Sequence, residues 1–248
     1  MNENKLSPNQ TFVLGMGSVL LVGFGIGFFV LLGQVLKDDK PNSGSIVPTV
    51  ASGAVAAQPS AGNGTSDIIL ADITKDDWIK GNPDAKISIV EFSDSECPFC
   101  KRFHETMNQV IEAYPDDVNW VYRNFPLASL HRKAEKEAQA LECAGELGGN
   151  EGFWSYTDRL YEITPSNDGL SEDELPKIAE YVGINKSSFE ECLLSERHAS
   201  EVRKDLSDGT RAGAQGTPYS VLVVDGEKYP ISGAVPFSQI QSMINSLL

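Results

Sequence analysis

The sequence has few cysteines and histidines and a deficit of positive charge. Its 248 residues include 4 Cys and 3 His, and 20 Lys and Arg stand against 35 Asp and Glu. So few cysteines exclude a disulfide-rich miniprotein, and the 41% of hydrophobic residues exclude collagen and a fully disordered chain. The histidines are scattered and no serine elbow motif is present. The sequence therefore gives no support for hydrolase chemistry.

The negative charge is confined to one part of the chain. Residues 1–66 hold three basic and three acidic side chains, so the whole formal net charge of -15 lies on residues 67–248. Binding of phosphate groups needs clustered Lys and Arg. We therefore expect no nucleic-acid partner.

Residues 12–36 contain no charged side chain and are long enough to cross a membrane as a helix. The charged run at 37–40 follows them directly, where a cleavable signal peptide would have small residues. The sequence therefore predicts an uncleaved, single-pass anchor in the cell membrane. We expect the short tail 1–11 in the cytoplasm and the rest of the chain outside it.

A segment rich in Pro, Gly, Ser and Ala follows the predicted anchor at 37–66. Such a composition buries too little apolar surface to fold, and it predicts a flexible linker. Residues 67–248 then form the predicted folded domain. We expect this domain to contain the catalytic residues and to lie outside the cytoplasm.

Apolar periodicity predicts the order of elements in the domain. We expect strands at 86–92, 118–124, 219–224 and 228–232, and helices at 97–114, 130–147, 151–163, 171–182, 186–194, 198–212 and 236–248. This order of strand, helix, strand, several helices, two strands and a helix predicts an α/β, thioredoxin-like fold. The extra helices form an insertion at about 129–214.

Cys97-Pro98-Phe99-Cys100 lies where the first expected strand gives way to its helix. A helix amino terminus lowers the pKa of a cysteine, and disulfide exchange needs a thiolate. A second thiol two residues on can reach back and resolve a mixed disulfide. The alternative is a metal site made of Cys97, Cys100 and His104. Structural zinc normally takes four ligands and the sequence has no second CxxC, so we expect neither a metal nor a cofactor.

Several segments resemble the DsbA family of thiol-disulfide oxidoreductases, and in particular its membrane-anchored members. They are VEFSDSECPFCKRFHE at 90–105, FPL at 125–127, ECAGELGG at 142–149 and GAQGTPYSVLVVDG at 213–226. The resemblance covers roughly residues 78–247. It implies that Cys97 is the exposed nucleophile and Cys100 the buried resolving thiol.

The same resemblance gives roles to three further residues. Thr217 and Pro218 match the family's cis-proline dipeptide, which lies against the active cysteines and pairs with extended substrate peptides. Glu91 matches the family's buried acidic residue under the active site. If Glu91 is buried, its pKa should rise towards neutrality, which suits proton transfer.

The chain departs from the strongly oxidising family members between its cysteines. Those members have a histidine where this chain has Phe99, which adds neither charge nor a polar donor. Asp94 and Glu96 would also disfavour the thiolate if they are close to it. Because a stabilised reduced form is what makes DsbA a strong oxidant, we expect a less extreme reduction potential here.

Cys143 and Cys192 fall in two separate predicted helices of the insertion. They are compatible with a structural disulfide, with two buried free thiols, or with an auxiliary redox relay. Free thiol pairs tend to oxidise outside the cytosol. Related sequences with the ECAGE pattern often carry such a second pair, so the resemblance favours the structural disulfide.

The sequence thus predicts an oxidoreductase that introduces disulfides into exported proteins with free cysteines. A quinone-linked membrane protein, resembling DsbB or a vitamin K epoxide reductase homologue, would reoxidise it. The nearest alternative is a disulfide isomerase or reductase on the same scaffold. A less favoured one is a non-catalytic, peptide-binding chaperone module.

Overall fold

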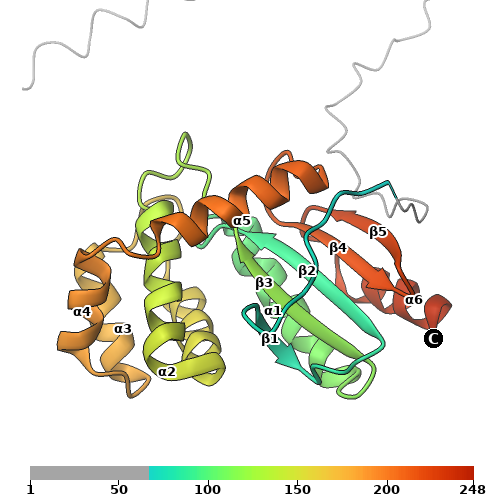
Figure 1. The fold of residues 1–248 in the computed structure, drawn as a ribbon, viewed down its shortest axis with the longest axis horizontal. Helices are drawn as coiled ribbons and strands as arrows, with labels where there is room; N and C mark the ends of the chain where they lie inside the picture. Colours follow the sequence, from blue (N-terminus) through green and yellow to red (C-terminus); the bar gives the residue numbers. More distant parts are fainter. Residues whose placement is uncertain (1–66) are drawn as a thin grey trace, which may run out of the picture. The chain divides into compact units, whose positions relative to one another are not determined.

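The computed structural model describes residues 67–248 and shows a five-stranded mixed sheet (Figure 1). The strands are β1 (Trp78–Gly81), β2 (Ile87–Ser93), β3 (Val118–Asn124), β4 (Tyr219–Val224) and β5 (Glu227–Ser232). Their order is β1-β3-β2-β4-β5, with β2 parallel to β3 and every other neighbouring pair antiparallel. The anchor expected at 12–36 and the linker expected at 37–66 lie outside the described residues.

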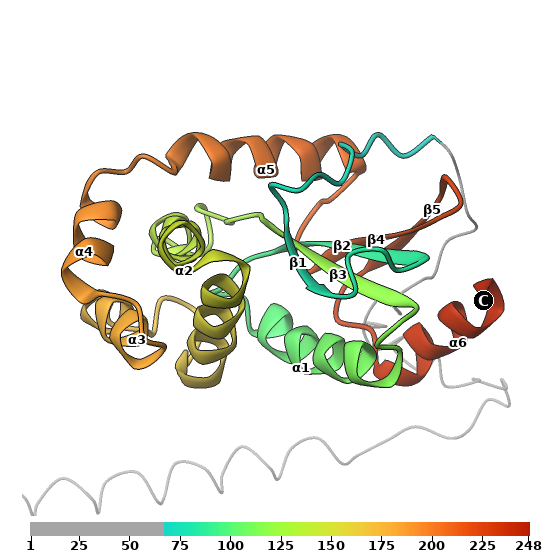
Figure 2. The same ribbon diagram turned by 60° about the horizontal axis from the view of Figure 1, so that its bottom comes forward.

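Helices cover both faces of the sheet. They are α1 (Pro98–Ala113), α2 (Ala134–Ile163), the 3₁₀ turn η1 (Glu172–Glu174), α3 (Leu175–Tyr181), α4 (Lys186–Leu194), α5 (Ala199–Ala212) and α6 (Phe237–Leu247). Figure 2 shows α5 on one face, α1 and α6 on the other, and α2, α3 and α4 beside the sheet. None of the helices within residues 67–248 is both long and apolar enough to cross a membrane.

The alternation along β2 assigns its residues to the two faces. Ile87 and Ile89 point to the layer of α1 and α6, whereas Val90 and Phe92 belong to the smaller core under α5. Glu91 has the same parity as the two isoleucines. The strand therefore directs a carboxyl group into the apolar layer below α1.

The structure confirms the thioredoxin-like fold and the helical insertion, and it adds one strand to the predicted elements. The edge strand β1 was not predicted, because four residues are too few to show a period of two. The two helices expected at 130–147 and 151–163 are present as the two segments of α2, which meet at a kink at Gly149. Gly149 has a φ of 65°, outside the helical region, which a glycine adopts without steric cost, so the first segment ends there and the chain changes direction.

Candidate active site

Cys97 is the amino-terminal cap of α1, immediately after the loop that leaves β2. Its backbone is extended, and Pro98 begins the helix, where a missing N–H costs no helical hydrogen bond. Cys97 is 5% exposed and Cys100, one turn further inside, is 0% exposed. Both are free thiols, so the structure represents the reduced form of the pair.

The surroundings of Cys97 favour its thiolate. A hydrogen bond from the Cys100 thiol is the main cause that lowers the pKa of Cys97 to about 6, against the opposing effect of burial. The Thr217 side chain and the backbone N–H groups of Phe99 and Cys100 act in the same direction. These N–H groups belong to the first turn of α1, whose carbonyl partners are missing and whose dipole favours negative charge.

Cys100 has the opposite character. Burial raises the pKa of its thiol well above the ordinary value, and the nearby Cys97 adds to the shift. The backbone N–H of Asp94 donates to the Cys100 sulfur at 3.5 Å and offsets only part of it. At neutral pH the pair therefore consists of one thiolate, 5% exposed at the start of α1, and one fully buried thiol behind it, which is the asymmetry that disulfide exchange requires.

Thr217 and Pro218 lie directly against the nucleophile. The peptide bond between them is cis. The Cys97 thiol donates to the Thr217 carbonyl oxygen at 3.5 Å, and the Pro218 carbonyl oxygen accepts from the N–H of Gly233 at 2.9 Å. The Thr217 hydroxyl has no partner other than Cys97 among residues 67–248, so it is available to stabilise the Cys97 thiolate.

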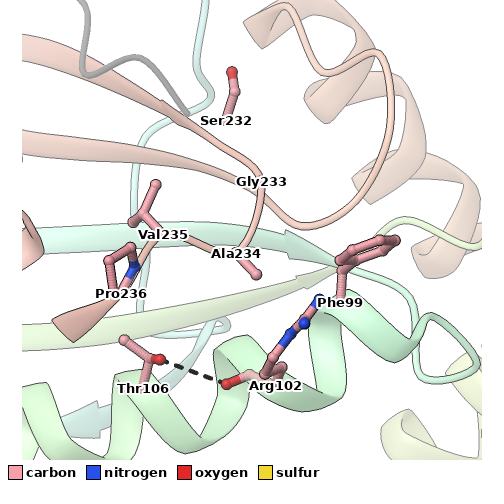
Figure 3. A pocket seen from close by; sticks show the side chains of 8 residues that line it. All are labelled: Phe99, Arg102, Thr106, Ser232, Gly233, Ala234, Val235 and Pro236. Carbon is pink, nitrogen blue, oxygen red and sulfur yellow. Dashed lines mark hydrogen bonds between the residues drawn. The ribbon is translucent and has the colours of Figure 1, made fainter. Parts of the chain in front are cut away.

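Two depressions flank the cysteines. The first, of about 450 Å³, is lined by Phe99, Arg102 and Thr106 of α1 and by the turn at 232–236 (Figure 3). Phe99 is 53% exposed, and the Arg102 guanidinium lies 4.9 Å from the centre of its ring. The second, of about 490 Å³, runs along 213–219 and shares the residues 232–233 with the first. Together they offer a partly apolar surface beside Phe99 of the CxxC motif and beside the Thr217-Pro218 dipeptide.

Glu91 is buried on the same face of the sheet as α1, at 1% exposure. Burial raises its pKa to about 8, while the Ser93 hydroxyl, which donates to Glu91 Oε1 at 2.6 Å, and the Trp120 indole oppose the shift. The Glu91 charge in turn contributes to the raised pKa of Cys100. The carboxyl group is thus protonated at neutral pH and titrates within reach of physiological conditions.

Asp94 and Glu96, the acidic neighbours that we expected to disfavour the thiolate, both accept hydrogen bonds from other groups. Asp94 is fully bonded, because it accepts from the N–H groups of Glu96 and Leu127 and pairs with His131 Nδ1 at 2.9 Å. Although burial lowers the pKa of His131, the hydrogen bond with Asp94 raises it overall. A hydrogen-bonded imidazole therefore lies beside the Asp94 carboxylate.

Glu96 faces the helical insertion. One of its oxygens accepts from the backbone N–H of Asp168 at 2.5 Å. Burial and the contact with Glu96 raise the pKa of Glu137 to about 9, while the Ser95 hydroxyl donates to Glu137 at 2.7 Å. Glu137 is therefore neutral at pH 7. Sequence reasoning missed both His131 and Glu137, whose proximity to the cysteines is visible only after the insertion has folded back.

The other two cysteines form a disulfide. Cys143 of α2 and Cys192 of α4 are joined with an S–S distance of 1.99 Å, and both are buried. His198 lies near them, with all three ligand atoms within 4.8 Å of one another. The bond between the two sulfurs removes both thiolate donors, so this group does not suit a metal ion in the oxidised state.

His104 does not join Cys97 and Cys100 in a metal-binding arrangement. Its Nε2 atom pairs with Asp158 at 2.6 Å, and its ring packs against those of Trp120 and Tyr161. The alternative of a metal centre at the CxxC motif therefore has no third ligand in His104.

The pKa of Cys97 leads to a direct prediction. Alkylation of the reduced chain by iodoacetamide should begin at Cys97 and should rise with pH around a midpoint near 6, because only the thiolate reacts. Cys100 should stay unmodified until the chain is unfolded. Peptide mapping of the alkylated protein across pH 4–9 measures both. A midpoint near that of a free thiol, about 8.5, would contradict the geometry described above.

Comparison with known proteins identifies the family and the relatives that the domain resembles. The sequence model of the Thioredoxin family matches residues 74–246. Among curated relatives, the Na(+)/H(+) antiporter NhaA 3 of Salinispora tropica is 26% identical over 249 residues, and NhaA 1 of Mycolicibacterium gilvum is 30% identical over 155 residues. These matches cover 92% and 62% of this chain but 36% and 24% of the relatives. The chain thus spans a minor part of the length of these antiporters.

Solved structures agree with the family model. Pseudomonas aeruginosa DsbA2 superimposes with a TM-score of 0.60 at 26% identity, covering 71% of this chain and 97% of that one. BdbD from Bacillus subtilis gives a TM-score of 0.61 at 24% identity, covering 73% and 97%. Wolbachia pipientis α-DsbA1 gives 0.62 at 20% identity, covering 74% and 96%. The chain therefore belongs to the thioredoxin family, with the fold of its DsbA-like members.

Proposed function

We propose that this chain is a membrane-anchored, extracytoplasmic thiol-disulfide oxidoreductase that introduces disulfides into exported proteins. One observation carries the proposal: Cys97 has a pKa of about 6 at the start of α1, and Cys100 behind it has a strongly raised pKa. A thiolate that is stable in the reduced enzyme is a good leaving group, which drives electrons from substrate thiols to the enzyme disulfide.

The exchange proceeds in two steps that conserve electrons. A substrate thiolate attacks the Cys97 sulfur of the oxidised enzyme, the bond between Cys97 and Cys100 breaks, and Cys100 leaves with the electron pair and takes a proton. A second substrate thiolate then attacks the substrate sulfur of the mixed disulfide, and Cys97 leaves as a thiolate. The substrate gains one disulfide and the enzyme becomes a dithiol.

Substrate binding in this proposal uses the surface around Thr217. Its carbonyl oxygen is 3.5 Å from the Cys97 sulfur, where it can accept from the backbone N–H of an extended peptide. The two flanking depressions accept side chains on either side of the substrate cysteine. The exposed ring of Phe99 favours apolar side chains in the first of them.

The anchor and the redox partner are parts of the same proposal. The uncharged run at 12–36 supports a membrane anchor, and a quinone-linked membrane protein of the DsbB or vitamin K epoxide reductase type would reoxidise the enzyme from the same bilayer. We expect the full chain to sediment with membranes and external protease to release a fragment of about residues 67–248. Recovery of the chain in the soluble fraction would reject the anchor but not the chemistry.

The remaining alternative is an isomerase or reductase. Two features favour this alternative. The pKa of Cys97 is only moderately lowered, and the apolar Phe99 between the cysteines stabilises the reduced form less than a histidine would. The test presents the oxidised chain with a reduced protein and the reduced chain with a scrambled one. We expect fast oxidation of the first and slow reshuffling of the second. The opposite order would make the chain an isomerase.

A further inference from the structure

A line of buried hydroxyl groups leads away from Glu91. The Ser93 hydroxyl at the end of β2 lies 2.6 Å from Glu91 Oε1 and 3.0 Å from the Tyr161 hydroxyl of α2. The Tyr161 hydroxyl lies 3.1 Å from that of Tyr122 on β3. All four side chains are buried.

The direction of these hydrogen bonds follows from the number of protons. Each hydroxyl carries one hydrogen. Because Ser93 donates its hydrogen to Glu91, Tyr161 must donate to Ser93, and Tyr122 must donate to Tyr161. Both tyrosine hydroxyls have pKa values raised by burial, so they remain protonated. The chain of donors therefore ends on one oxygen of Glu91.

The other oxygen of Glu91 takes no part in the hydroxyl line. Glu91 Oε2 is buried and has no partner with hydrogen-bond geometry among residues 67–248, although the Trp120 indole acts on the carboxyl group and lowers its pKa. A proton on the carboxyl group lies there, since Oε1 accepts from Ser93. Glu91 thus has one oxygen that holds an exchangeable proton below α1 and another that receives protons from the hydroxyl line.

Tyr161 connects this line to the edge of a depression, although its side chain is only 3% exposed. It lines a depression of about 280 Å³ together with Lys101, His104, Glu105, Asn108, Asp158 and Glu162. The centres of the Tyr161 and His104 rings are 4.6 Å apart, and His104 Nδ1 is a buried atom without a hydrogen-bond partner in the described part of the chain. Tyr122 is not among the residues that line this depression.

We infer that Ser93 and Tyr161 carry protons between Glu91 and the depression beside His104, and that Tyr122 lies off this route. The inference rests on the proposed function, in which Glu91 exchanges a proton with Cys100. Ser93 and Tyr161 act through Glu91 and are positioning residues. A carboxyl group at 1% exposure has no direct contact with solvent. Glu91 therefore needs such a route to exchange protons with water.

One proton moves along this route each time the Cys97–Cys100 disulfide is opened. When substrate thiolate displaces Cys100, the Cys100 thiolate takes the proton of Glu91 and leaves a carboxylate. Ser93 passes its proton to Glu91, Tyr161 passes its own to Ser93, and solvent in the depression restores the proton of Tyr161. Both hydroxyls end unchanged, and the net result is the transfer of one proton from solvent to Cys100. Reversal of the steps deprotonates Cys100 when it attacks a mixed disulfide.

The experiment compares Tyr161→Phe with Tyr122→Phe in the full chain. Both remove one buried phenol hydroxyl from the same network, but only the first interrupts the route. The readout is the rate at which dithiothreitol reduces the Cys97–Cys100 disulfide, followed by intrinsic fluorescence from pH 5 to 9 in H₂O and D₂O. General acid–base catalysis contributes 10²–10⁴-fold, so partial loss of proton supply should slow Tyr161→Phe about tenfold near pH 7.

We expect the slowing of Tyr161→Phe to be larger in D₂O and to depend on pH, whereas Tyr122→Phe should keep the rate, the pH profile and the isotope effect of the original chain. Ser93→Ala should slow the reaction like Tyr161→Phe. It should also raise the pKa of Glu91, because the Ser93 hydrogen bond lowers that pKa. Equal behaviour of the two Tyr→Phe variants would overturn the route, as would a loss of rate that is independent of pH and of isotope.

Glu91→Gln separates this inference from the proposed function. If Glu91→Gln slows reduction near pH 7 but Tyr161→Phe behaves like Tyr122→Phe, the route is wrong while the role of Glu91 stands. If Glu91→Gln leaves the rate and the pH profile unchanged, the proton exchange between Glu91 and Cys100 is wrong, and the route falls with it. Oxidation of a reduced test protein by Tyr122→Phe shows in parallel that the exchange activity itself is intact.

Discussion

Cys97→Ser should reduce thiol-disulfide exchange to the uncatalysed background. The serine hydroxyl stays protonated at neutral pH and forms no disulfide, whereas the Cys97 thiol has a pKa of about 6. Removal of a covalent nucleophile costs on the order of 10³-fold or more in rate. The measurement is the rate at which the chain oxidises a reduced protein. A variant that retains a substantial part of this rate would show that the chemistry lies elsewhere.

Cys100→Ser should instead trap intermediates. Cys97 stays reactive in this variant, but no thiol lies behind it to resolve the mixed disulfide. Substrate proteins that contain a disulfide should therefore accumulate as covalent adducts, because Cys97 attacks the substrate disulfide, one substrate cysteine leaves as a thiolate, and the mixed disulfide is not resolved. Non-reducing gels and mass spectrometry detect these adducts. The control is Cys143→Ala with Cys192→Ala, which removes two cysteines outside the site and should preserve exchange. Adducts that form with Cys97→Ser and not with Cys100→Ser would reverse the assigned roles.

Removal of the disulfide between Cys143 and Cys192 should lower the free energy of unfolding by about 4 kcal/mol. The bond closes a loop with a sequence separation of 49, and in the chain-entropy model such a cross-link mainly restricts the unfolded chain. It joins α2 to α4 and therefore holds the helical insertion together. Urea unfolding of the purified double alanine variant and of the original chain measures the difference.

A reductant provides the control for this second prediction. Strong reductant during unfolding should bring the original chain close to the stability of the double alanine variant and should leave that variant almost unchanged. The buried sulfurs should also resist mild reductant that opens the bond between Cys97 and Cys100. If the double alanine variant is as stable as the original chain, the disulfide does not hold the insertion.

The core of the domain follows from local patterns in the sequence. Period-two alternation identified β2, and the apolar spacing that follows it identified α1, so the position of Cys97 at their junction was predictable. The edge strand β1 was not, because its four residues pair with β3 through backbone contacts that carry no sequence pattern. The break between helices predicted at 130–147 and 151–163 is present in the structure, at Gly149.

The polar environment of the cysteines was harder to predict. His131, Glu137 and Tyr161 lie between 34 and 64 positions after Cys97 in the printed sequence, and they reach the site only because α2 packs beside the sheet. From the sequence, Asp94 and Glu96 looked like unopposed negative charges. Their hydrogen-bond partners, His131 and Asp168, lie in the helical insertion. No short motif in the sequence predicts these contacts.

The reduction potential links this environment to function. The pKa of about 6 for Cys97 lies between the values of about 3.5 for DsbA and about 7 for thioredoxin. Phe99 supplies no stabilising charge, while the first turn of α1 and the Cys100 thiol supply part of what a histidine would. The thiolate is therefore stabilised to an intermediate degree, and the oxidising strength of the disulfide should be intermediate as well.

Equilibration of the Cys97–Cys100 pair with glutathione buffers of known ratio measures this potential directly. The pKa of Cys97 predicts a value between about −270 mV, as in thioredoxin, and about −120 mV, as in DsbA. Such a value makes the disulfide able to oxidise exported proteins without the most extreme driving force. A potential below that of thioredoxin would contradict the account, because the chain would then act as a reductant.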